Sequence, residues 1–305
     1  MSAQRIIGQK RKNNYSPAAF FYDDTVKENI MMSSQGSFKH QYGPWALIAG
    51  GSEGIGLAFA ELLAQRGINL VLLSRNDQKL SDARATIRRQ SAVDVRCIRI
   101  DLSGDDYMPS VIQATADIEI GLLIYNAGAV HGAELFLDQD VTSATHLVNL
   151  NCRGPVLLAH HFGRLMRNRR RGGMILLSSM AALAGGSYIA TYAATKSFDI
   201  VFAQSLWHEL KSDNIDVLGL IAGATATPAM AASGFDLSQG DEDGAPVFMS
   251  SVAVAQEGLD NLKNGPIRVA GEGNRAALDW FSSLPRAELV ELMSQATADL
   301  YQKNR

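Results

Sequence analysis

The sequence predicts an α/β fold in which one parallel, doubly wound sheet carries helices on both faces. Short apolar runs alternate with helical stretches over residues 45–269. The first run, 45–49, continues into a glycine-rich turn at 50–56 and then into an amphipathic helix. Apolar runs bounded by turn residues are typical of buried parallel strands. Strands that alternate with helices at this pitch imply right-handed crossovers and a single parallel sheet.

The pattern of apolar residues places each element. After the first strand we expect further strands at 69–73, 93–100, 122–125, 174–177, 216–221 and 267–269. We expect helices at about 55–66, at 77–89 with Asp77 as the N-cap, from about 140, at 151–167, at 192–211 and at 251–263.

Composition and charge narrow the class of protein. The 305 residues are 47% hydrophobic and 19% charged, and the net charge of -3 argues against nucleic acid or an anionic membrane as partner. No apolar run approaches the ~18–20 residues that span a bilayer, and no signal peptide is visible. Cys97 and Cys152 lack metal-ligand spacing, so we expect reduced thiols, no metal site and a cytoplasmic location.

Three regions are predicted. Residues 1–40 form a polar N-terminal extension whose apolar patch, 18–22, docks on the body or on a second subunit. Residues 41–272 form the α/β domain, including a lid at about 228–250. Residues 273–305 form a helical extension that packs on the body or on a partner subunit.

The arginine-rich run at 167–171 falls at a helix C-terminus, where cations complement the helix dipole.

Several polar or glycine-rich segments directly follow strands. In doubly wound sheets ligands bind beyond the carboxyl ends of the strands, so we expect these segments to line one edge. Glycines let the backbone approach a phosphate, and the helix behind them directs N–H groups at it; a plain strand-to-helix turn is the alternative. The segments are 50–56, 74–75, 101–102, 126–128, 178–179 and 222–227.

Tyr192 and Lys196 are four residues apart on a predicted helix. This spacing places both side chains on one face, with Cβ atoms about 5–6 Å apart. The ammonium stabilises the phenolate, so the tyrosine can act as a general acid toward a carbonyl or as a general base toward an alcohol. Chance spacing on a long helix is the alternative.

Together these residues resemble the short-chain dehydrogenase/reductase family, in its single-domain branch with a Rossmann-like fold. The resemblance covers residues 45–269, nearly three quarters of the chain, with the motifs in family order. Ala49, Tyr125 and Ala222 depart from the threonine, asparagine and proline usual in the family. The matching residues are Gly50, Gly54, Gly56, Asn126, Ala127, Gly128, Asn151, Ser179, Tyr192 and Lys196.

The resemblance implies roles for a catalytic tetrad. Ser179 would hydrogen-bond the substrate oxygen while Tyr192 transfers the proton. Lys196 would contact the nicotinamide ribose, and Asn151 would hold a water that links Lys196 to solvent. Ser178 is the alternative for the serine role, and capping of its own helix is the alternative for Asn151.

The resemblance also implies a nicotinamide dinucleotide cofactor. NAD enzymes place an acidic residue at the end of the second strand, whereas this chain has Ser74 and Arg75 there, which favours the 2′-phosphate of NADP. Glu53 argues against NADP, so NAD stays open. The predicted cofactor-binding residues are Gly50, Ser52, Glu53, Gly54, Ile55, Gly56, Ser74, Arg75, Asp101, Leu102, Asn126, Ala127, Gly128, Tyr192, Lys196 and Thr227.

The predicted activity is the interconversion of a ketone or aldehyde with an alcohol by hydride transfer. Apolar residues in the lid favour an apolar small-molecule substrate, and His131 is a candidate to reach it. Relatives form homodimers or homotetramers through helices such as 151–167 and 192–211. The alternatives are a nucleotide-binding regulator without turnover and an epimerase or dehydratase on the same fold.

Overall fold

The computed structural model describes residues 36–128, 134–232, 234, 236–238 and 248–302. By its contacts the chain divides into two units, Met1–Gly36 and Ser37–Arg305, and the architecture below is that of the second. The N-terminal patch at 18–22, His131 and much of the expected lid therefore lie outside the described residues.

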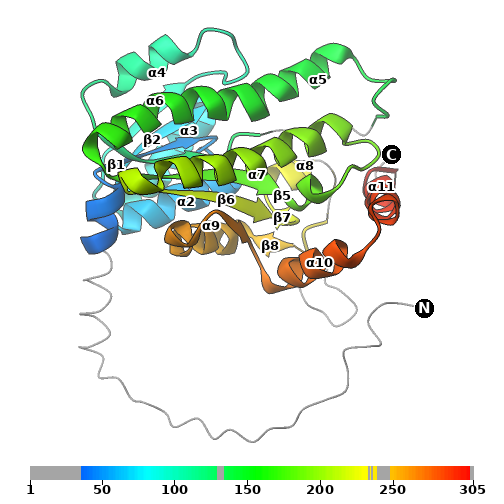
Figure 1. Cartoon of the computed structure of the whole chain (residues 1–305). Helices are drawn as coiled ribbons and strands as arrows, with labels where there is room; N and C mark the ends of the chain where they lie inside the picture. The colour runs from blue at the N-terminus through cyan, green and yellow to red at the C-terminus, as the bar shows by residue number, and fades with distance from the viewer. Residues whose placement is uncertain (1–35, 129–133, 233, 235, 239–247, 303–305) are drawn as a thin grey trace, which may run out of the picture. The chain divides into compact units, whose positions relative to one another are not determined.

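A seven-stranded parallel sheet forms the centre of the second unit, and it confirms the predicted fold class (Figure 1). The spatial order is β3-β2-β1-β4-β5-β6-β9. The order reverses direction beside β1, which is the point where a doubly wound sheet forms a ligand crevice. The strands are β1 (Trp45–Ala49), β2 (Asn69–Ser74), β3 (Val95–Arg99), β4 (Ile120–Tyr125), β5 (Gly172–Ser179), β6 (Ile215–Ala222) and β9 (Ile267–Val269).

Helices cover both faces of this sheet because alternate strand residues point to opposite faces (Figure 1). Ile48 and Leu72 pack under α2 (Gly54–Gln65), α3 (Asp77–Gln90) and α9 (Ser251–Asp260). Leu47 and Leu73 face the other layer. That layer consists of α4 (Met108–Thr115), α5 (Val141–Val148), α6 (Gly154–Arg169) and α7 (Ala190–Leu210).

Two details differ from the prediction. Asn76, and not Asp77, is the N-cap of α3, because its side chain accepts a hydrogen bond from the Lys79 amide at 3.0 Å. The predicted helix from about 140 and the helix at 151–167 are joined by a π-helical turn, η2 (Asn149–Arg153). A π turn within a helix is rare, and the apolar pattern of this stretch gave no reason to expect one.

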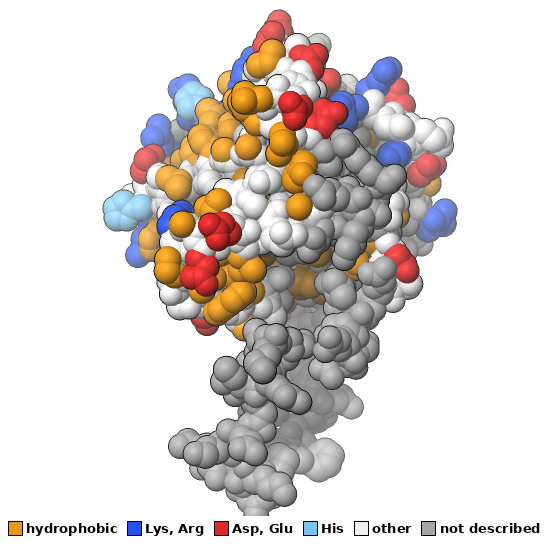
Figure 2. All heavy atoms as spheres, turned by 90° about the vertical axis from the view of Figure 1, so that its right-hand side faces the viewer, with side chains coloured by type: hydrophobic (Ala, Val, Ile, Leu, Met, Phe, Trp, Pro, Cys, Tyr) orange, Lys and Arg blue, Asp and Glu red, His pale blue; other side chains and the backbone are white. Residues whose placement is uncertain are grey.

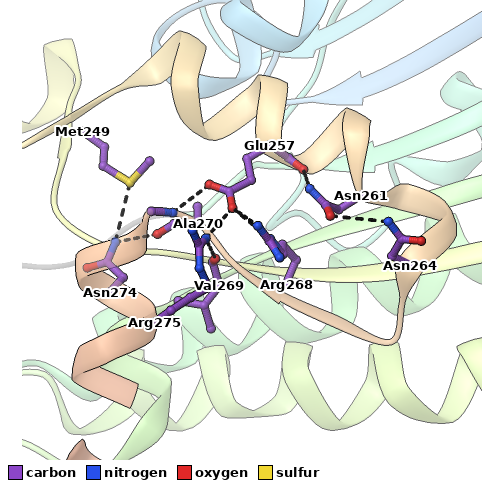
Figure 3. A network of polar contacts seen from close by, with 10 residues as sticks. Met249, Glu257, Asn261, Asn264, Arg268, Val269, Ala270, Asn274 and Arg275 are labelled. Atoms are coloured by element: carbon purple, nitrogen blue, oxygen red, sulfur yellow. Dashed lines mark hydrogen bonds and ion pairs between the residues drawn. The ribbon is translucent and has the colours of Figure 1, made fainter. Parts of the chain in front are cut away.

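The C-terminal region adds α10 (Glu272–Ser283) and α11 (Arg286–Gln302) after β9. A polar network ties α10 to the body (Figure 3). Glu257 on α9 accepts hydrogen bonds from Arg268 on β9, from Arg275 on α10 and from the Gly271 amide. Two short elements, α8 (Pro228–Ala232) and the strand pair β7 (Thr225–Ala226) and β8 (Met249–Ser250), lie between β6 and α9.

The arginine-rich run has structural partners. Arg169 donates to the Ile120 carbonyl at 2.7 Å, Arg170 pairs with Asp213 at 3.2 Å, and Arg171 pairs with Glu119. Within the described residues, none of the helices combines the length and the apolar character that crossing a bilayer requires.

Candidate active site

A cavity of about 550 Å³ opens at the carboxyl edge of the sheet, where the predicted segments follow their strands. It brings together most of the residues predicted from the sequence, from all six segments. Its lining includes Gly50, Ser52, Glu53, Ile55, Ser74, Arg75, Asp101, Leu102, Asn126, Ala127, Gly128, Ser179, Tyr192, Lys196 and Thr227. Gly54, Gly56 and Asn151 lie behind this lining.

The glycine turn is held in a shape that larger residues do not allow. Gly50 adopts φ of +76°, in the left-handed region. A Cβ on Gly56 would lie 2.0 Å from the Gly50 carbonyl oxygen. Asn126 braces the same turn from β4, since its Nδ2 donates to the Gly50 carbonyl at 2.9 Å. The backbone at this point is therefore close-packed and fixed.

The start of α2 fits a phosphate group. Glu53 occupies the N-cap position, but its side chain makes no capping hydrogen bond to the helix. The first N–H groups of a helix have no partner inside the helix, and together with the helix dipole they attract an anion. Because Ser52, Glu53 and Ile55 all line the cavity, the residues present fit the pyrophosphate of a dinucleotide.

At the end of β2 the structure places a group of polar and basic side chains. Ser52 Oγ lies 2.9 Å from Ser74 Oγ, which joins the glycine turn to the second strand. Arg75 follows with an exposed side chain, and Arg99 from β3 lies with it around a smaller hollow beside the main cavity. Arg99 also pairs with Asp77 at 3.5 Å.

The Glu53 carboxylate, which the sequence suggested would oppose a 2′-phosphate, has a partner. Lys79 Nζ donates to both of its oxygens, at 2.9 and 2.8 Å. Sequence reasoning missed this lysine because it lies on the next helix, 26 residues away. With Glu53 paired, Arg75 is a basic side chain that lines the cavity together with Asp101.

Asp101 and Leu102 follow the third strand and line the same cavity. Burial raises the pKa of the Asp101 carboxyl, but hydrogen bonds from Ser103 and the charge of Arg75 lower it overall. The carboxylate is therefore ionised at neutral pH. An ionised Asp101 is a hydrogen-bond acceptor in the predicted cofactor site.

Tyr192 and Lys196 both face the cavity from the first half of α7. Lys196 is 5% exposed, and its Nζ donates to the Leu177 carbonyl at 2.7 Å and to Asp199 Oδ2 at 3.0 Å. Burial lowers the pKa of the Lys196 ammonium, but the Asp199 carboxylate and the Tyr192 oxygen outweigh this effect and raise it. Lys196 is therefore a fixed cation beside the phenol.

Asn151 lies in the π-helical turn η2 and meets the lysine at Gly128. A Cβ on Gly128 would lie 3.4 Å from Lys196 Nζ and 3.5 Å from Asn151 Oδ1. Asn151 is fully buried, and its Oδ1 has no hydrogen-bond partner among the described residues. Its Nδ2 donates to Thr195 Oγ1 at 2.9 Å, and Thr195 Oγ1 in turn donates to the Tyr192 carbonyl at 2.8 Å.

Thr195 is a second residue that sequence reasoning missed. It lies between the two predicted catalytic residues of α7, and its hydroxyl orients the Asn151 amide so that Oδ1 faces Lys196. The capping role considered for Asn151 does not occur, since this residue lies within continuous helical structure from α5 to α6.

The two serines at the end of β5 have different surroundings. Ser178 is 3% exposed, and its Oγ donates to the Lys196 carbonyl at 2.7 Å, so its hydroxyl is used in packing. Ser179 is half-buried and caps the 3₁₀ turn Met180–Leu183 by accepting from the Ala181 amide at 3.2 Å. A hydroxyl that accepts there keeps its own O–H available to the cavity.

One end of the cavity is largely apolar. Met180, Ile189 and Met230 line it together with Thr297 from α11. Thr297 Oγ1 donates to the Ser187 carbonyl at 2.9 Å, so the C-terminal helix is attached to the loop that precedes Tyr192. The sequence predicted that this helix packs on the body or on a partner, but it gave no reason to connect the helix with the site.

The arrangement can supply a proton and orient a polar oxygen. A phenol beside a buried ammonium and a serine hydroxyl can exchange a proton with a carbonyl or alcohol oxygen. The described residues hold no group of three or more His, Cys, Asp or Glu side chains placed to bind a metal ion. A nicotinamide group bound along the glycine turn would supply or accept the hydride.

Comparison with known proteins agrees with this geometry. The family model "short chain dehydrogenase" matches residues 44–236, well over half of the chain. The chain belongs to this family. The predicted recognition is therefore confirmed, and with it the predicted activity: NAD(P)-dependent oxidoreduction between a carbonyl and an alcohol.

Three relatives are 27–30% identical to this chain over the aligned residues. A 7β-hydroxysteroid dehydrogenase of Clostridium sardiniense is 28% identical, over 83% of this chain and 95% of its own. The human inactive hydroxysteroid dehydrogenase-like protein 1 is 30% identical, over 67% of this chain and 62% of its own. The structure of a short-chain dehydrogenase from Sphingobium yanoikuyae with NADPH is 27% identical, with a TM-score of 0.67 over 80% of this chain and 97% of its own.

Proposed function

We propose that this protein is an NADP(H)-preferring oxidoreductase whose substrate carries its carbonyl or alcohol on a large apolar skeleton of the steroid kind. One observation supports the proposal most. Tyr192, Lys196 and Ser179 line one cavity together with the glycine turn, so a proton donor and a dinucleotide site share a single space. In this proposal Asn151, Ser179, Tyr192 and Lys196 have the roles of the family tetrad.

The substrate class is supported by the cavity and by a relative. The end of the cavity that lies between Tyr192 and α11 is lined by apolar side chains such as Met180, Ile189 and Met230. The side of the molecule on which α10 and α11 lie carries several groups of hydrophobic side chains, with basic side chains standing singly near its rim (Figure 2). A relative with 28% identity is a hydroxysteroid dehydrogenase.

The test is a panel of paired ketones and alcohols, followed by nicotinamide absorbance with NADPH and with NADH. The panel includes a 7-oxosteroid with its 7β-alcohol, a bulky aryl ketone, a long-chain 3-oxoacyl thioester and a small ketone of similar polarity. We expect turnover of the bulky apolar members and little turnover of the small ketone. Turnover of the small ketone alone would contradict the proposed substrate class.

The preference for NADP is proposed from charge. Arg75 and Arg99 lie around one hollow beside the cavity together with Asp101, and the Glu53 carboxylate of the glycine turn is paired with Lys79. A guanidinium forms forked hydrogen bonds to a phosphate that a ribose hydroxyl cannot match. Replacement of Arg75 by Asp should therefore lower the affinity for NADPH by about tenfold or more and raise that for NADH.

The matched control for this experiment is Arg89→Asp, which makes the same charge change on the exposed side of α3. Dissociation constants for both cofactors are measured by quenching of protein fluorescence. If Arg75→Asp changes the affinity for NADPH and NADH by equal factors, the assignment of the 2′-phosphate to Arg75 is wrong.

We also propose that two copies associate through the outer face of α5, α6 and α7, as the resemblance implies. Val141, Val156 and Val201 on these helices are 67%, 38% and 62% exposed, an apolar surface of the kind that marks an interface. Val201→Glu should then convert a dimer or tetramer to smaller species in light scattering. A wild-type protein that is monomeric at micromolar concentration would exclude this proposal.

A relative named inactive gives a second candidate, a nucleotide-binding protein without turnover. The presence of all four tetrad residues argues against it. Saturable NADPH binding without absorbance change across the whole panel would favour this candidate. A product without net nicotinamide oxidation would instead indicate an epimerase or dehydratase. The cytoplasmic location stays a prediction of the sequence.

A further inference from the structure

Asp199 lies one turn beyond Lys196 on α7, and its side chain is buried beside the predicted catalytic residues. Asp199 is 1% exposed, and its Oδ2 lies 3.0 Å from Lys196 Nζ. The side chains of the pair are only 2% and 6% exposed. Exposed ion pairs at this helical spacing contribute little. This pair is different because both charges are removed from water.

Burying a carboxylate costs several kcal/mol, and an apolar side chain of similar size serves packing at least as well. Packing alone therefore does not explain why residue 199 is an aspartate. Its second oxygen, Oδ1, has no hydrogen-bond partner among the described residues. The contact with the ammonium is thus the polar interaction that this carboxylate makes in the described structure, and any role for it acts through Lys196.

The pair also fixes the direction of the ammonium. A lysine has three N–H donors, and here one is donated to the Leu177 carbonyl at 2.7 Å and one to Asp199. The third is left for the cavity side, next to Gly128. The Asn151 amide oxygen lies on this side. If the cofactor binds as the resemblance implies, its nicotinamide ribose lies there too.

The other titratable groups around the pair carry no charge at neutral pH. Burial and then the Asp199 carboxylate raise the pKa of the Cys152 thiol on η2 to about 11. Burial, with smaller effects of Tyr107 and Asp199, raises the pKa of Tyr125 on β4 well above its ordinary value. The pKa of Asp199 itself is raised by burial, against the opposing effect of Lys196. Lys196 and Asp199 are therefore the charged pair that lies on the same helix as Tyr192.

We propose that Asp199 is a positioning residue that acts through Lys196: its carboxylate fixes the ammonium and offsets part of its charge, so that Tyr192 keeps its proton to higher pH. An unpaired ammonium favours the phenolate, and a carboxylate beside that ammonium opposes the effect. A tyrosine that holds its proton at neutral pH is ready to protonate a carbonyl oxygen. Asp199 thus favours the direction of reduction, a consequence that rests on the proposed function.

The direct test does not depend on turnover. The ultraviolet absorbance of the tyrosinate anion is measured as a function of pH in the full-length protein and in Tyr192→Phe. The difference between the two curves gives the deprotonation of Tyr192 alone, called here the Tyr192 step. The same difference is then measured in the Asp199→Asn background. Asp216→Asn is the matched control, because Asp216 is a part-buried carboxylate that accepts from Tyr42 at 2.7 Å at the opposite end of the sheet.

We expect the midpoint of the Tyr192 step to fall by about half a pH unit or more in Asp199→Asn and to stay unchanged in Asp216→Asn. Asp199→Glu, which keeps the charge, should restore most of the wild-type midpoint. An unchanged or higher midpoint in Asp199→Asn would overturn the proposal. If Asp199→Asn does not fold, Asp199→Ser, which is smaller, gives the same comparison.

A kinetic arm separates this proposal from the proposed function. With the 7-oxosteroid and its alcohol as probes, the alkaline limb of reduction and the acidic limb of oxidation should both move to lower pH in Asp199→Asn. If the wild-type protein shows no turnover, the proposed function is wrong. The absorbance titration would still test the role of Asp199, because it does not depend on turnover. Lower kcat in Asp199→Asn with both limbs unmoved would show a structural role and contradict the proposal.

Discussion

The two ends of the cavity are built in different ways. At the dinucleotide end, backbone groups of neighbouring segments touch directly, as at Gly50, where a Cβ would lie 2.9 Å from the Ala127 backbone. At the substrate end, side chains from distant parts of the chain make the wall, as where Thr297 reaches Ser187 across 110 residues. The first end tolerates almost no change, and the second can be altered one side chain at a time. A family can therefore keep its cofactor while its substrates vary.

Among the changes that compare the two ends, the largest effect is expected at the dinucleotide end. Gly56→Ala should lower the affinity for NADPH by roughly 100-fold, because the turn must move to admit the Cβ. Gly273→Ala is the control, since a Cβ at that position of α10 meets nothing within 4 Å. Affinity is measured by fluorescence titration, with circular dichroism to check folding. Near wild-type NADPH affinity in Gly56→Ala would show that the turn is not close-packed.

A smaller effect is expected where the C-terminal helices are attached. Glu257→Gln should lower the free energy of unfolding by about 2 kcal/mol, because it weakens charged hydrogen bonds to Arg268 and Arg275. Asp260→Asn on the same helix is the control, since its pair with Arg66 is more exposed and should contribute under ~1 kcal/mol. Urea unfolding with fluorescence detection compares the two variants.

The Glu257 effect should depend on pH with a definite sign. Burial raises the pKa of Glu257, but the Gly271 amide and the two arginines lower it overall, below the ordinary value of 4.5. A depressed pKa means that the ionised group contributes its stability above the unfolded-state value and loses it as the pH falls through the folded-state value. The difference between wild type and Glu257→Gln should therefore shrink below about pH 4. A constant difference from pH 7 to pH 3 would contradict this account.

The smallest effect is expected at the substrate end. Thr297→Val removes the hydrogen bond to Ser187 and keeps the shape of the side chain. We expect KM for a bulky ketone to rise about fivefold, with the NADPH affinity unchanged, since the lost hydrogen bond is worth about 1 kcal/mol. Ser282→Ala on α10, which removes a hydroxyl bonded within its own helix, is the control. A matching loss of NADPH affinity in Thr297→Val would show that the two ends are not separate.

The same contrast explains what the sequence could predict. The sheet was predictable because most strands contain an apolar run and β3 alternates apolar with polar residues. The final strand matches the prediction residue for residue at 267–269. The segments that follow the strands were also predictable, since parallel strands bring their carboxyl ends to one edge. Helix α4 was not, because its eight residues, with two buried, carry too weak an apolar pattern.

Contacts between distant side chains could not be predicted from local patterns. The pairing of Lys79 with Glu53, the orientation of Asn151 by Thr195 and the place of Thr297 in the cavity wall each depend on how two helices meet or a helix meets a loop. Spacing within one helix drew attention to Tyr192 and Lys196, and the resemblance to the family was needed to prefer them over chance spacing. It did not single out Asp199, because a carboxylate three residues from a lysine is usually an exposed pair.

The most direct test of the central claim is a single-turnover experiment with Tyr192→Phe. Enzyme in excess, loaded with NADPH, is mixed with the best ketone of the panel, and nicotinamide absorbance is followed in wild type and variant. The account predicts that the variant binds NADPH with wild-type affinity and that its rate of hydride transfer falls by about 1,000-fold. A variant that transfers hydride at the wild-type rate would show that Tyr192 does not supply the proton.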